Sequence, residues 1–299
     1  MRELSGEIRE KIIEIIGDLD SLPTLPHVAA QVMELSMSSK SSVREIAKIL
    51  ETDPALTSKV LKVANSAFYG LKQQVNSLEL ALVVLGMGEV SHLVMSISVF
   101  SAFPDIPGKK TFNREQFWVH SAGCGHFARV IARRLGEPAL SGEVFVGGLL
   151  HDIGKVVLDE KAHDVFTDIF TQAQEEDRAI YEVEKERLGF THEEVGLVLA
   201  QKWNLPLSLQ EAISLHHHPE DAEKAQFTVA VVRMADLFCK ANEIGYGGDT
   251  KGFVFTEDVS WALVQKIKPE IASIDIEKFT FELNDEIKKV RDFINIARG

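Results

Sequence analysis

The sequence has few cysteines and no long apolar run. Its two cysteines, Cys124 and Cys239, form none of the spacings typical of zinc or redox motifs, which favours a reducing cytoplasm. The longest apolar stretch, residues 93–103, is interrupted by serines and is too short to span a bilayer. Charges throughout residues 1–17 exclude the apolar core of a secretory signal. We therefore expect a soluble cytoplasmic protein without membrane attachment.

Positive charge is also scarce. The 299 residues include 32 lysines and arginines against 45 acidic residues, a formal net charge of −13 that repels phosphate backbones. Residues 42–66 nonetheless resemble a helix-turn-helix, whose second helix would offer Lys59 and Lys62 as cations. Because so few cations are present, we expect no nucleic-acid partner. The preferred interpretation is a packed helix pair with three buried side chains, Leu56, Val60 and Val63.

Strand-like alternation is nearly absent, and the helical periodicity of the apolar residues predicts an all-α fold. In the first half of the chain we expect helices at residues 6–17, 25–37, 42–51, 54–66, 77–85 and 88–102. A cluster of helix-breaking residues at 103–110 predicts a boundary. The expected organisation has three parts: an N-terminal helical subdomain at residues 1–107, a helical bundle at 108–245 and a C-terminal helical extension at 246–299.

Capping motifs predict where helices begin in the second half. Each motif pairs an N-cap residue with Glu or Gln three positions later: Thr191 with Glu194, Ser208 with Glu211 and, more weakly, Asn113 with Gln116. We therefore expect helices that begin near residues 114, 192 and 209.

These helix starts predict the direction of two histidines. In the helix expected from residue 114, His120 falls on an apolar stripe together with Phe117 and Cys124. In the helix expected from residue 209, His216 continues the buried face just before Pro219 ends the helix. Buried imidazoles need polar partners, whereas the two cysteines are interpreted as small buried apolar residues.

Two aspartates are embedded in apolar segments. Asp152 follows His151 within residues 144–157, and Asp236 lies within residues 228–238. An ionised carboxylate in such surroundings is costly unless it is paired or binds a metal. Each buried group alone has an ordinary structural explanation, such as a histidine bonded to a backbone carbonyl. Together, the buried acids and imidazoles predict a divalent metal site.

The segment Leu149-Leu150-His151-Asp152-Ile153-Gly154-Lys155 resembles the signature of HD-domain metal phosphohydrolases, in the form found in HD-GYP cyclic-dinucleotide phosphodiesterases. The remaining ligand positions of that family are similar to His120, His192, the pair His216-His217 and Asp236. The resemblance implies a helical bundle of the HD superfamily with two divalent transition-metal ions bridged by Asp152. His120, His151 and Asp236 would bind one ion, and His192, His216 and His217 the other. Iron, manganese, nickel and zinc all suit such ligands.

The resemblance also implies catalytic roles for Asp152 and Lys155. Lys155 would orient or neutralise a phosphate; the alternative interpretation is an exposed helix lysine. His218 directly follows the histidine pair, so a one-residue shift in register would exchange it with a neighbour. Three other histidines have no place in the pattern and are interpreted as structural or surface residues: His27, His92 and His163.

The Gly-Tyr-Pro segment expected after the histidine pair is replaced by residues 218–222. The first half instead resembles the HDOD family. Its landmarks are Leu22-Pro23-Thr24-Leu25-Pro26, Asp53-Pro54-Ala55-Leu56, Ala64-Asn65-Ser66-Ala67-Phe68-Tyr69-Gly70 and Ala81-Leu82-Val83-Val84-Leu85-Gly86. Together the resemblance spans roughly residues 20–240.

Resemblance to the HDOD family implies a module of bacterial signalling, with signalling proteins or a small phosphate-containing ligand as partners. We therefore expect an HDOD-type regulatory module that retains a dinuclear metal site. The alternative is a metal-dependent phosphohydrolase that acts on nucleotides or cyclic nucleotides.

Overall fold

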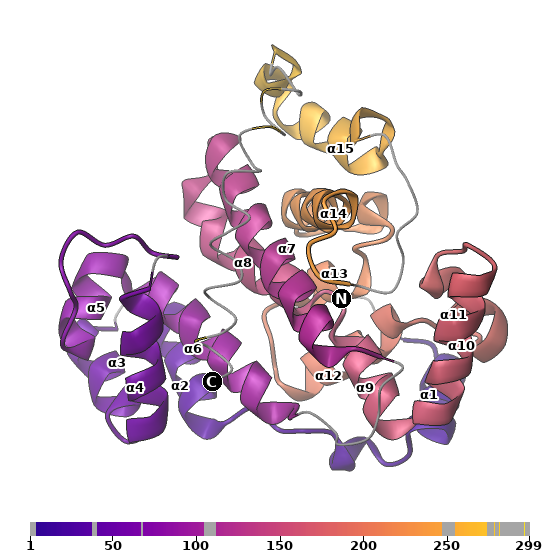
Figure 1. The fold of residues 1–299 in the computed structure, drawn as a ribbon, viewed down its shortest axis with the longest axis horizontal. Helices are drawn as coiled ribbons and strands as arrows, with labels where there is room; N and C mark the ends of the chain where they lie inside the picture. The colour runs from indigo at the N-terminus through magenta and orange to yellow at the C-terminus, as the bar shows by residue number, and fades with distance from the viewer. Residues whose placement is uncertain are drawn as a thin grey trace. The chain divides into compact units, whose positions relative to one another are not determined.

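The computed structural model describes residues 4–37, 41–66, 68–104, 112–246 and 255–273, together with residues 278, 281 and 296. Helices make up the regular structure of these residues, with no strand in the described ranges, which confirms the all-α fold (Figure 1). The chain divides into two compact units. The large unit contains residues 1–22 and 105–284, and the small unit contains residues 23–104 and 285–299.

The small unit is built around one central helix, α6. Its helices are α2 (His27–Met37), α3 (Val43–Leu50), α4 (Pro54–Ala64), α5 (Leu78–Leu85) and α6 (Met87–Ala102). Helices α2, α4 and α5 pack on α6, which is buried along most of its length. Because Leu56, Val60 and Val63 of α4 are buried, α3 and α4 form the packed helix pair that the sequence predicted.

The short helices of the small unit begin at well-formed caps. The Asp53 carboxylate accepts a hydrogen bond from the backbone N–H of Leu56 at 2.9 Å, and Pro54 occupies the first turn of α4. Ser42 and Glu45 form a capping box at the start of α3. Helix boundaries in this unit therefore lie within two residues of the expected ones, because the capping residues are local in sequence.

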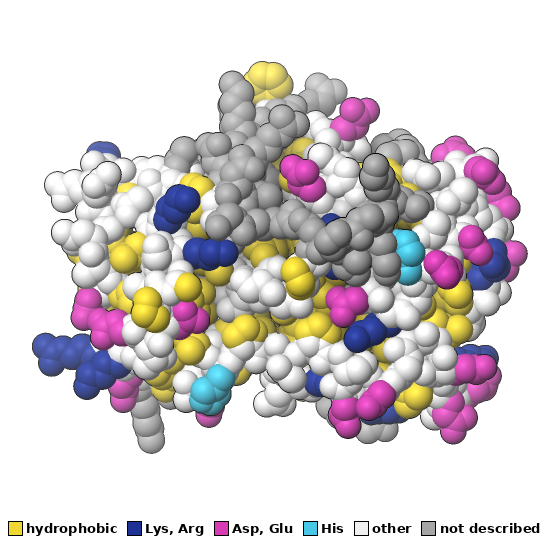
Figure 2. All heavy atoms as spheres, turned by 60° about the horizontal axis from the view of Figure 1, so that its bottom comes forward, with side chains coloured by type: hydrophobic (Ala, Val, Ile, Leu, Met, Phe, Trp, Pro, Cys, Tyr) yellow, Lys and Arg dark blue, Asp and Glu magenta, His cyan; other side chains and the backbone are white. Residues whose placement is uncertain are grey.

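Among the described residues, no single helix is long and apolar enough to cross a membrane. Helices α5 and α6 have the length and apolar composition of a membrane span only when taken as a pair, and this pair is bent by 116°. On the face in Figure 2, lysine and arginine side chains are scattered among acidic ones. That distribution agrees with the acidic balance of the sequence.

The core of the large unit consists of α7, α8 and α14, which pack against one another (Figure 1). Helix α12 packs on α9 and α13, α13 also contacts α8, and α15 covers α14. The α-helices of this unit are α1 (Gly6–Ile16), α7 (Arg114–Arg134), α8 (Ser141–Leu150), α9 (Ile153–Lys161), α10 (His163–Glu175), α11 (Ile180–Leu188), α12 (His192–Lys202), α13 (Leu207–Ser214), α14 (Gln226–Ala241) and α15 (Val259–Ile267). Its 3-10 helices are η1 (Leu19–Ser21), η2 (Pro138–Leu140), η3 (Pro219–Asp221), η4 (Phe255–Glu257) and η5 (Pro269–Ser273).

The first 22 residues belong to the large unit, which differs from the expected division of the chain. Helix α1 packs on α9, and the Lys202 ammonium donates hydrogen bonds to the carbonyl oxygens of Leu19 and Asp20 at 2.8 and 2.9 Å. The expected boundary near residue 107 lies outside the described residues; the units separate after Pro104. Of the expected C-terminal extension, the structure describes mainly residues 255–273, and these belong to the large unit.

Two of the three predicted caps in the large unit are present. Thr191 and Glu194 form a capping box, and the Asn113 side chain accepts a hydrogen bond from the backbone N–H of Gln116. The third prediction is wrong, because α13 begins at Leu207 and Ser208 lies inside the helix. Its partner Glu211 instead accepts hydrogen bonds from the backbone N–H groups of Lys224 and Ala225.

The ends of two helices also differ from expectation. Helix α13 stops at Ser214, so His216 lies in the following turn rather than on the helix. The apolar segment at residues 144–157 is not one continuous helix, because His151 and Asp152 separate α8 from α9. Both breaks put predicted site residues at helix ends, where the side chains of successive positions can turn in different directions.

Candidate metal centre

Glycines allow the helices that carry the site to approach closely. A Cβ added at Gly148 of α8 would lie 2.7 Å from the backbone of Cys124 on α7. A Cβ at Gly154 of α9 would overlap the carbonyl oxygen of His192 on α12. These contacts leave no room for a side chain. They bring α7 against α8 and α9 against α12, and His120, His151 and His192 lie on or next to these helices.

The structure brings the predicted site residues to one place in the large unit. His120 comes from α7, His151 and Asp152 from the break between α8 and α9, and Lys155 from α9. His192 comes from α12, Asp236 from α14, and His216 and His217 from the turn after α13. All of them are buried, with His217 the most exposed at 7%.

Four of the histidines have the same hydrogen-bonding pattern. Their Nδ1 atoms lie within hydrogen-bond distance of an oxygen: His151 with the Gly148 carbonyl (2.7 Å), His216 with the Ile213 carbonyl (3.1 Å), His120 with the Ile244 carbonyl (3.3 Å) and His192 with the Glu184 carboxylate (2.6 Å). A ring that donates from Nδ1 has an unprotonated Nε2 when it is neutral. The four Nε2 atoms are thereby available as ligand atoms facing the site.

The first half-site consists of His120, Cys124, His151 and Asp236. One ligand atom from each lies within 4.8 Å of the others. The Asp236 Oδ1 atom is 3.0 Å from His120 Nε2 and 3.7 Å from His151 Nε2. The Lys240 ammonium lies 2.9 Å from the other oxygen of Asp236. This half-site therefore combines two imidazoles, a thiol and a carboxylate.

The second half-site consists of Asp152, His192, His216 and His217, whose ligand atoms also lie within 4.8 Å of one another. Asp152 Oδ1 is 3.1 Å from His192 Nε2 and 3.4 Å from His216 Nε2. His217 Nε2 lies 3.2 Å from His192 Nε2. Three imidazoles and one carboxylate oxygen therefore converge.

Asp152 contacts both half-sites. Its Oδ1 atom faces the second half-site, whereas its Oδ2 atom lies 3.3 Å from Nε2 of His151 in the first. The Lys155 ammonium donates a hydrogen bond to the same Oδ2 at 2.7 Å. Lys155 is fully buried, so the alternative interpretation as an exposed helix lysine is wrong.

The donor atoms fit divalent cations. Nε2 of His151 and Oδ1 of Asp152 are buried and make no hydrogen bond, although imidazole and carboxylate atoms surround them. Facing lone pairs at such distances repel one another unless a proton or a cation lies between them. Imidazole and carboxylate ligands are those that divalent transition metals prefer. The cluster therefore has the composition and the unsatisfied atoms of a metal site.

In the absence of a metal, protons take over part of this role. Burial lowers the pKa of His192, but the Glu184 and Asp152 carboxylates outweigh it and raise the pKa to about 9. Burial likewise lowers the pKa of His120, and the neighbouring Cys124 and Asp236 raise it to about 9. For His216, burial dominates and lowers the pKa to about 3. A metal that binds near neutral pH would thus displace protons from His120 and His192.

His217 differs from the other four histidines. Its Nδ1 atom lies 3.1 Å from Nη1 of Arg233, which is itself paired with the Asp258 carboxylate at 3.2 Å. A guanidinium can only donate, so Nδ1 accepts and the proton of the neutral ring is on Nε2. Burial lowers the pKa of His217 well below its usual value, which keeps the ring neutral. To bind an ion through Nε2, His217 would have to lose this proton.

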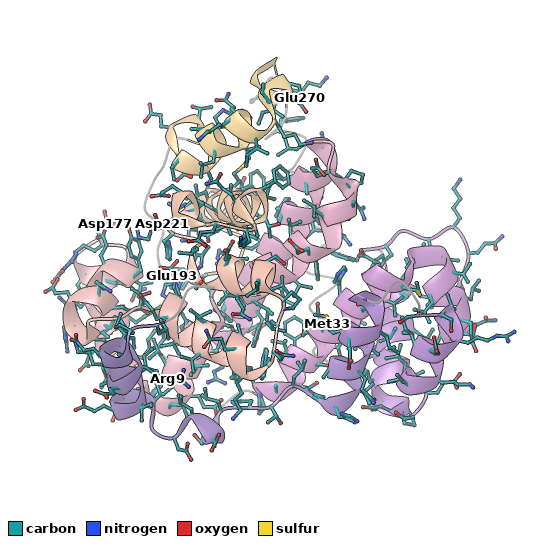
Figure 3. The ribbon with its side chains drawn as sticks, turned by 180° about the vertical axis from the view of Figure 1, so that it is seen from behind. Arg9, Met33, Asp177, Glu193, Asp221 and Glu270 are labelled. Carbon is teal, nitrogen blue, oxygen red and sulfur yellow. The ribbon has the colours of Figure 1, made fainter. Side chains whose placement is uncertain are left out.

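Several polar residues around the centre were not predicted. Cys124 and Lys240 each lie four positions after a site residue on the same helix, a spacing that could have indicated them. Glu184 and Arg233 carry no comparable signal in the sequence. Glu193, labelled in Figure 3, accepts a hydrogen bond from the backbone N–H of His217 at 3.1 Å.

The ambiguity at His218 is resolved. His218 is half exposed and lies 3.8 Å from Glu220, so the buried pair is His216 and His217. His163 pairs with Asp159 at 2.8 Å and is not part of either half-site.

The fold and the centre together define an all-helical protein with a buried histidine–aspartate cluster suited to divalent ions. Residues 22–219 match the model of the HDOD domain. Because this match covers most of the chain, the protein belongs to the HDOD family.

Solved structures extend the likeness over nearly the whole chain. An HDOD domain protein of unknown function from Geobacter sulfurreducens has a TM-score of 0.80 and 27% sequence identity, with 96% of each chain covered. A protein from Shewanella amazonensis SB2B named "Putative phosphohydrolase" has a TM-score of 0.75 and 26% identity, with 98% of each chain covered.

A curated relative is longer. An uncharacterized protein of Treponema pallidum (strain Nichols) is 24% identical over 240 residues, which are 79% of this chain and 46% of that protein. This chain therefore spans less than half the length of that curated relative.

Proposed function

We propose that this protein is an HDOD-type regulatory module of bacterial signalling that retains a two-ion metal centre. One observation carries the proposal: the centre has a full set of ligand residues, yet every one of them is buried. Full burial of the ligands suits an ion whose role is to stabilise one conformation of the protein.

In this proposal, Asp152 bridges the two ions because its two oxygens face different half-sites. His120, His151 and Asp236 hold one ion, and His192, His216 and His217 hold the other. Iron, manganese, nickel and zinc are the candidate ions. When bound, ions of this kind act as Lewis acids and lower the pKa of a bound water.

The ligand residues explain how such a centre could regulate. They come from α7, the α8–α9 break, α12, α14 and the turn after α13, so bound ions would hold these elements together. A ligand bound only by the folded state stabilises that state by mass action. A signalling protein or a small phosphate-containing ligand that recognises the stabilised state would then bind more tightly when the metal centre is occupied.

The second candidate function is a metal-dependent phosphohydrolase acting on nucleotides or cyclic nucleotides. It is favoured by Lys155, which is held at 2.7 Å from the bridging carboxylate, where its charge could neutralise a phosphate. The likeness to the Shewanella protein points in the same direction. The replacement of Gly-Tyr-Pro by residues 218–222 argues against cyclic dinucleotides as substrates.

A substrate screen of metal-reconstituted protein separates the two functions. We expect no hydrolysis of cyclic-di-GMP and at most slow cleavage of generic phosphodiesters. Robust turnover of any nucleotide, cyclic nucleotide or phosphodiester, lost in both Asp152→Ala and Lys155→Ala, would make the protein an enzyme and contradict the regulatory function. Lys185→Ala, which removes an exposed lysine of α11, is the matched control.

A further inference from the structure

His120 takes its orienting partner from a distant part of the chain. His151 and His216 lie in turns after their helices, and the Nδ1 atom of each lies within hydrogen-bond distance of the carbonyl oxygen three residues earlier. His120 instead lies within α7, where the backbone carbonyls of the preceding turn accept the helix's own hydrogen bonds. Its acceptor is the carbonyl oxygen of Ile244, 124 residues later in the chain, at 3.3 Å.

The end of α14 turns the chain back towards α7. Glu243 has a positive φ of 51°, and its backbone N–H donates a hydrogen bond to the Lys240 carbonyl at 3.3 Å. The backbone N–H of Ile244 donates to the Cys239 carbonyl at 2.9 Å, which completes the Schellman motif that ends many helices. The Ile244 side chain then packs on α7, where a Cβ added at Gly123 would lie 2.8 Å from it. Ile244 is therefore held against α7.

Gly245 allows the next residues to approach α7 closely. Its φ of 67° lies in the left-handed region that favours glycine. A Cβ added at this position would lie 2.3 Å from the Gln116 carbonyl oxygen and 2.3 Å from the backbone nitrogen of His120. Any side chain at residue 245 would therefore be strained in φ and would overlap the helix at His120.

Tyr246 anchors this segment to two helices. Its backbone N–H donates a hydrogen bond to the Gln116 carbonyl of α7 at 3.1 Å, and its hydroxyl accepts one from the Gln174 amide at 2.9 Å. Its ring lies edge-on to that of Phe170, with 5.6 Å between the ring centroids. Gln174 and Phe170 both belong to α10. Residues 244–246, which we call the strap, therefore connect His120 to α10.

We propose that the strap positions His120 for the ion of the first half-site, with Gly245 as the residue that permits this, and that it couples occupancy of the first half-site to α10. The proposal rests on the two-ion centre proposed above. A carbonyl oxygen only accepts hydrogen bonds, so the strap favours the His120 tautomer with its proton on Nδ1 and its Nε2 lone pair towards the ion. The coupling is reciprocal: if the closed strap strengthens ion binding, the bound ion stabilises the closed strap by the same factor.

The ordinary alternative is that the strap is a loop that packs on the core. Changes in it would then destabilise the protein without preference for one ion. Gly136 provides a matched comparison, because it follows the other end of α7 with a similar φ of 79° and a Cβ added there would meet no neighbouring atom within 4 Å. Gly136→Ala therefore introduces comparable backbone strain without the overlap at His120.

Zinc titration of metal-free protein, in competition with a chromophoric chelator, tests the positioning role. We expect two binding events, and Glu184→Gln identifies the event at the second half-site because Glu184 contacts His192. Gly245→Ala should weaken the other event by at least about tenfold, the loss typical of a missing orienting partner, and leave the second half-site nearly unchanged. Gly136→Ala should keep both affinities. Tyr246→Ala, which removes the side-chain contacts with α10, should weaken the same event as Gly245→Ala, but less.

Amide hydrogen exchange of the unmodified protein tests the reciprocal effect and does not depend on whether a variant folds. Saturation with zinc should slow exchange at the backbone N–H of Tyr246, which is bonded to the Gln116 carbonyl. The reference is the backbone N–H of Gly136, which is bonded to the Arg133 carbonyl at the other end of α7. We expect a larger gain in protection at Tyr246 than at Gly136.

The outcomes separate the two proposals. Zinc affinities that Gly245→Ala leaves unchanged, or weakens equally at both events, would overturn the role of the strap and leave the two-ion centre intact. Equal gains in protection at Tyr246 and Gly136 would do the same, and they decide the question if Gly245→Ala does not fold. Unmodified protein that binds no zinc would overturn the two-ion centre and the role of the strap with it.

Discussion

The two half-sites of the metal centre are similar in burial and different in how their ligands are held. In the first, His120 and His151 are oriented by backbone carbonyls, and Asp236 is held by Lys240 from the same helix. In the second, His192 depends on the Glu184 carboxylate, and His217 is contacted by the Arg233 guanidinium. We infer that the first half-site is preorganised for an ion. Both must lose protons to bind an ion, from His120 in the first and His192 in the second, but the second must also rearrange at His217, so its ion should bind more weakly.

The largest expected effect comes from a substitution of Asp152, the residue that contacts both half-sites. Asp152→Asn should reduce metal content from about two ions per chain to nearly none, because the bridging carboxylate supplies charge to both positions. Elemental analysis after gel filtration measures this loss. Glu211→Gln, which alters another buried carboxylate of the large unit, is the control and should keep both ions. Retention of both ions by Asp152→Asn would contradict the bridging role.

The next change affects one half-site alone. Glu184→Gln replaces the carboxylate that lies 2.6 Å from Nδ1 of His192. Loss of such a supporting partner typically weakens metal affinity by about 10- to 100-fold. We expect this weakening for the second ion and little change for the first, measured by competition with a chromophoric chelator. Equal weakening of both ions would show that the half-sites are not independent.

The stability of the metal-free protein and the occupancy of the metal centre should change with pH in opposite directions. The pKa values of His120 and His192 in the metal-free fold, about 9, lie above the ordinary 6.5, so their stabilising contribution is complete below pH 6.5 and lost as pH rises through about 9. Metal binding competes with these protons and weakens in acid, so occupancy should fall below about pH 6.

Thermal unfolding with and without a chelator measures both trends. The metal-free melting temperature should fall between pH 6.5 and 9, and the stabilisation by metal, several degrees near neutral pH, should increase over the same range. Metal occupancy that stays constant down to about pH 4 would be incompatible with histidine ligands.

The smallest effect concerns Arg233. Because its guanidinium favours the tautomer of His217 with a proton on Nε2, Arg233→Met should strengthen binding of the second ion several-fold and leave the first unchanged. Isothermal titration calorimetry of the second binding event measures the difference. Arg178→Met, which alters a partly exposed arginine outside the centre, serves as the control. Weaker binding of the second ion in Arg233→Met would mean that Arg233 positions His217 for the metal.

The sequence predicted features whose causes are local. The N-cap residues Asn113 and Thr191 determine where α7 and α12 begin, and the apolar stripe of α7 correctly placed His120 inside. The HD motif indicated which residues gather, because its spacing matches a known family. Features that depend on neighbouring residues or on a known motif could therefore be predicted from the sequence.

The features that the sequence did not predict depend on residues that are distant in the chain. Ser208 does not cap α13, because Glu211 bonds to backbone groups 13 and 14 residues later. Residues 1–22 join the large unit through contacts such as that of Lys202 with Leu19, which nothing in the local sequence indicates. Cys124 is buried, as the sequence predicted, but its apolar neighbours on the helix did not indicate which polar groups surround it. Its position near Asp236 and His151 depends on how α7, α8 and α14 pack.

Metal content tests the central claim most directly. Protein produced without chelators and analysed for transition metals should contain close to two ions per chain, with His151→Ala showing reduced content and a lower melting temperature. A preparation without metal, together with unchanged stability of His151→Ala, would show that the centre is a set of buried core histidines and contradict the account.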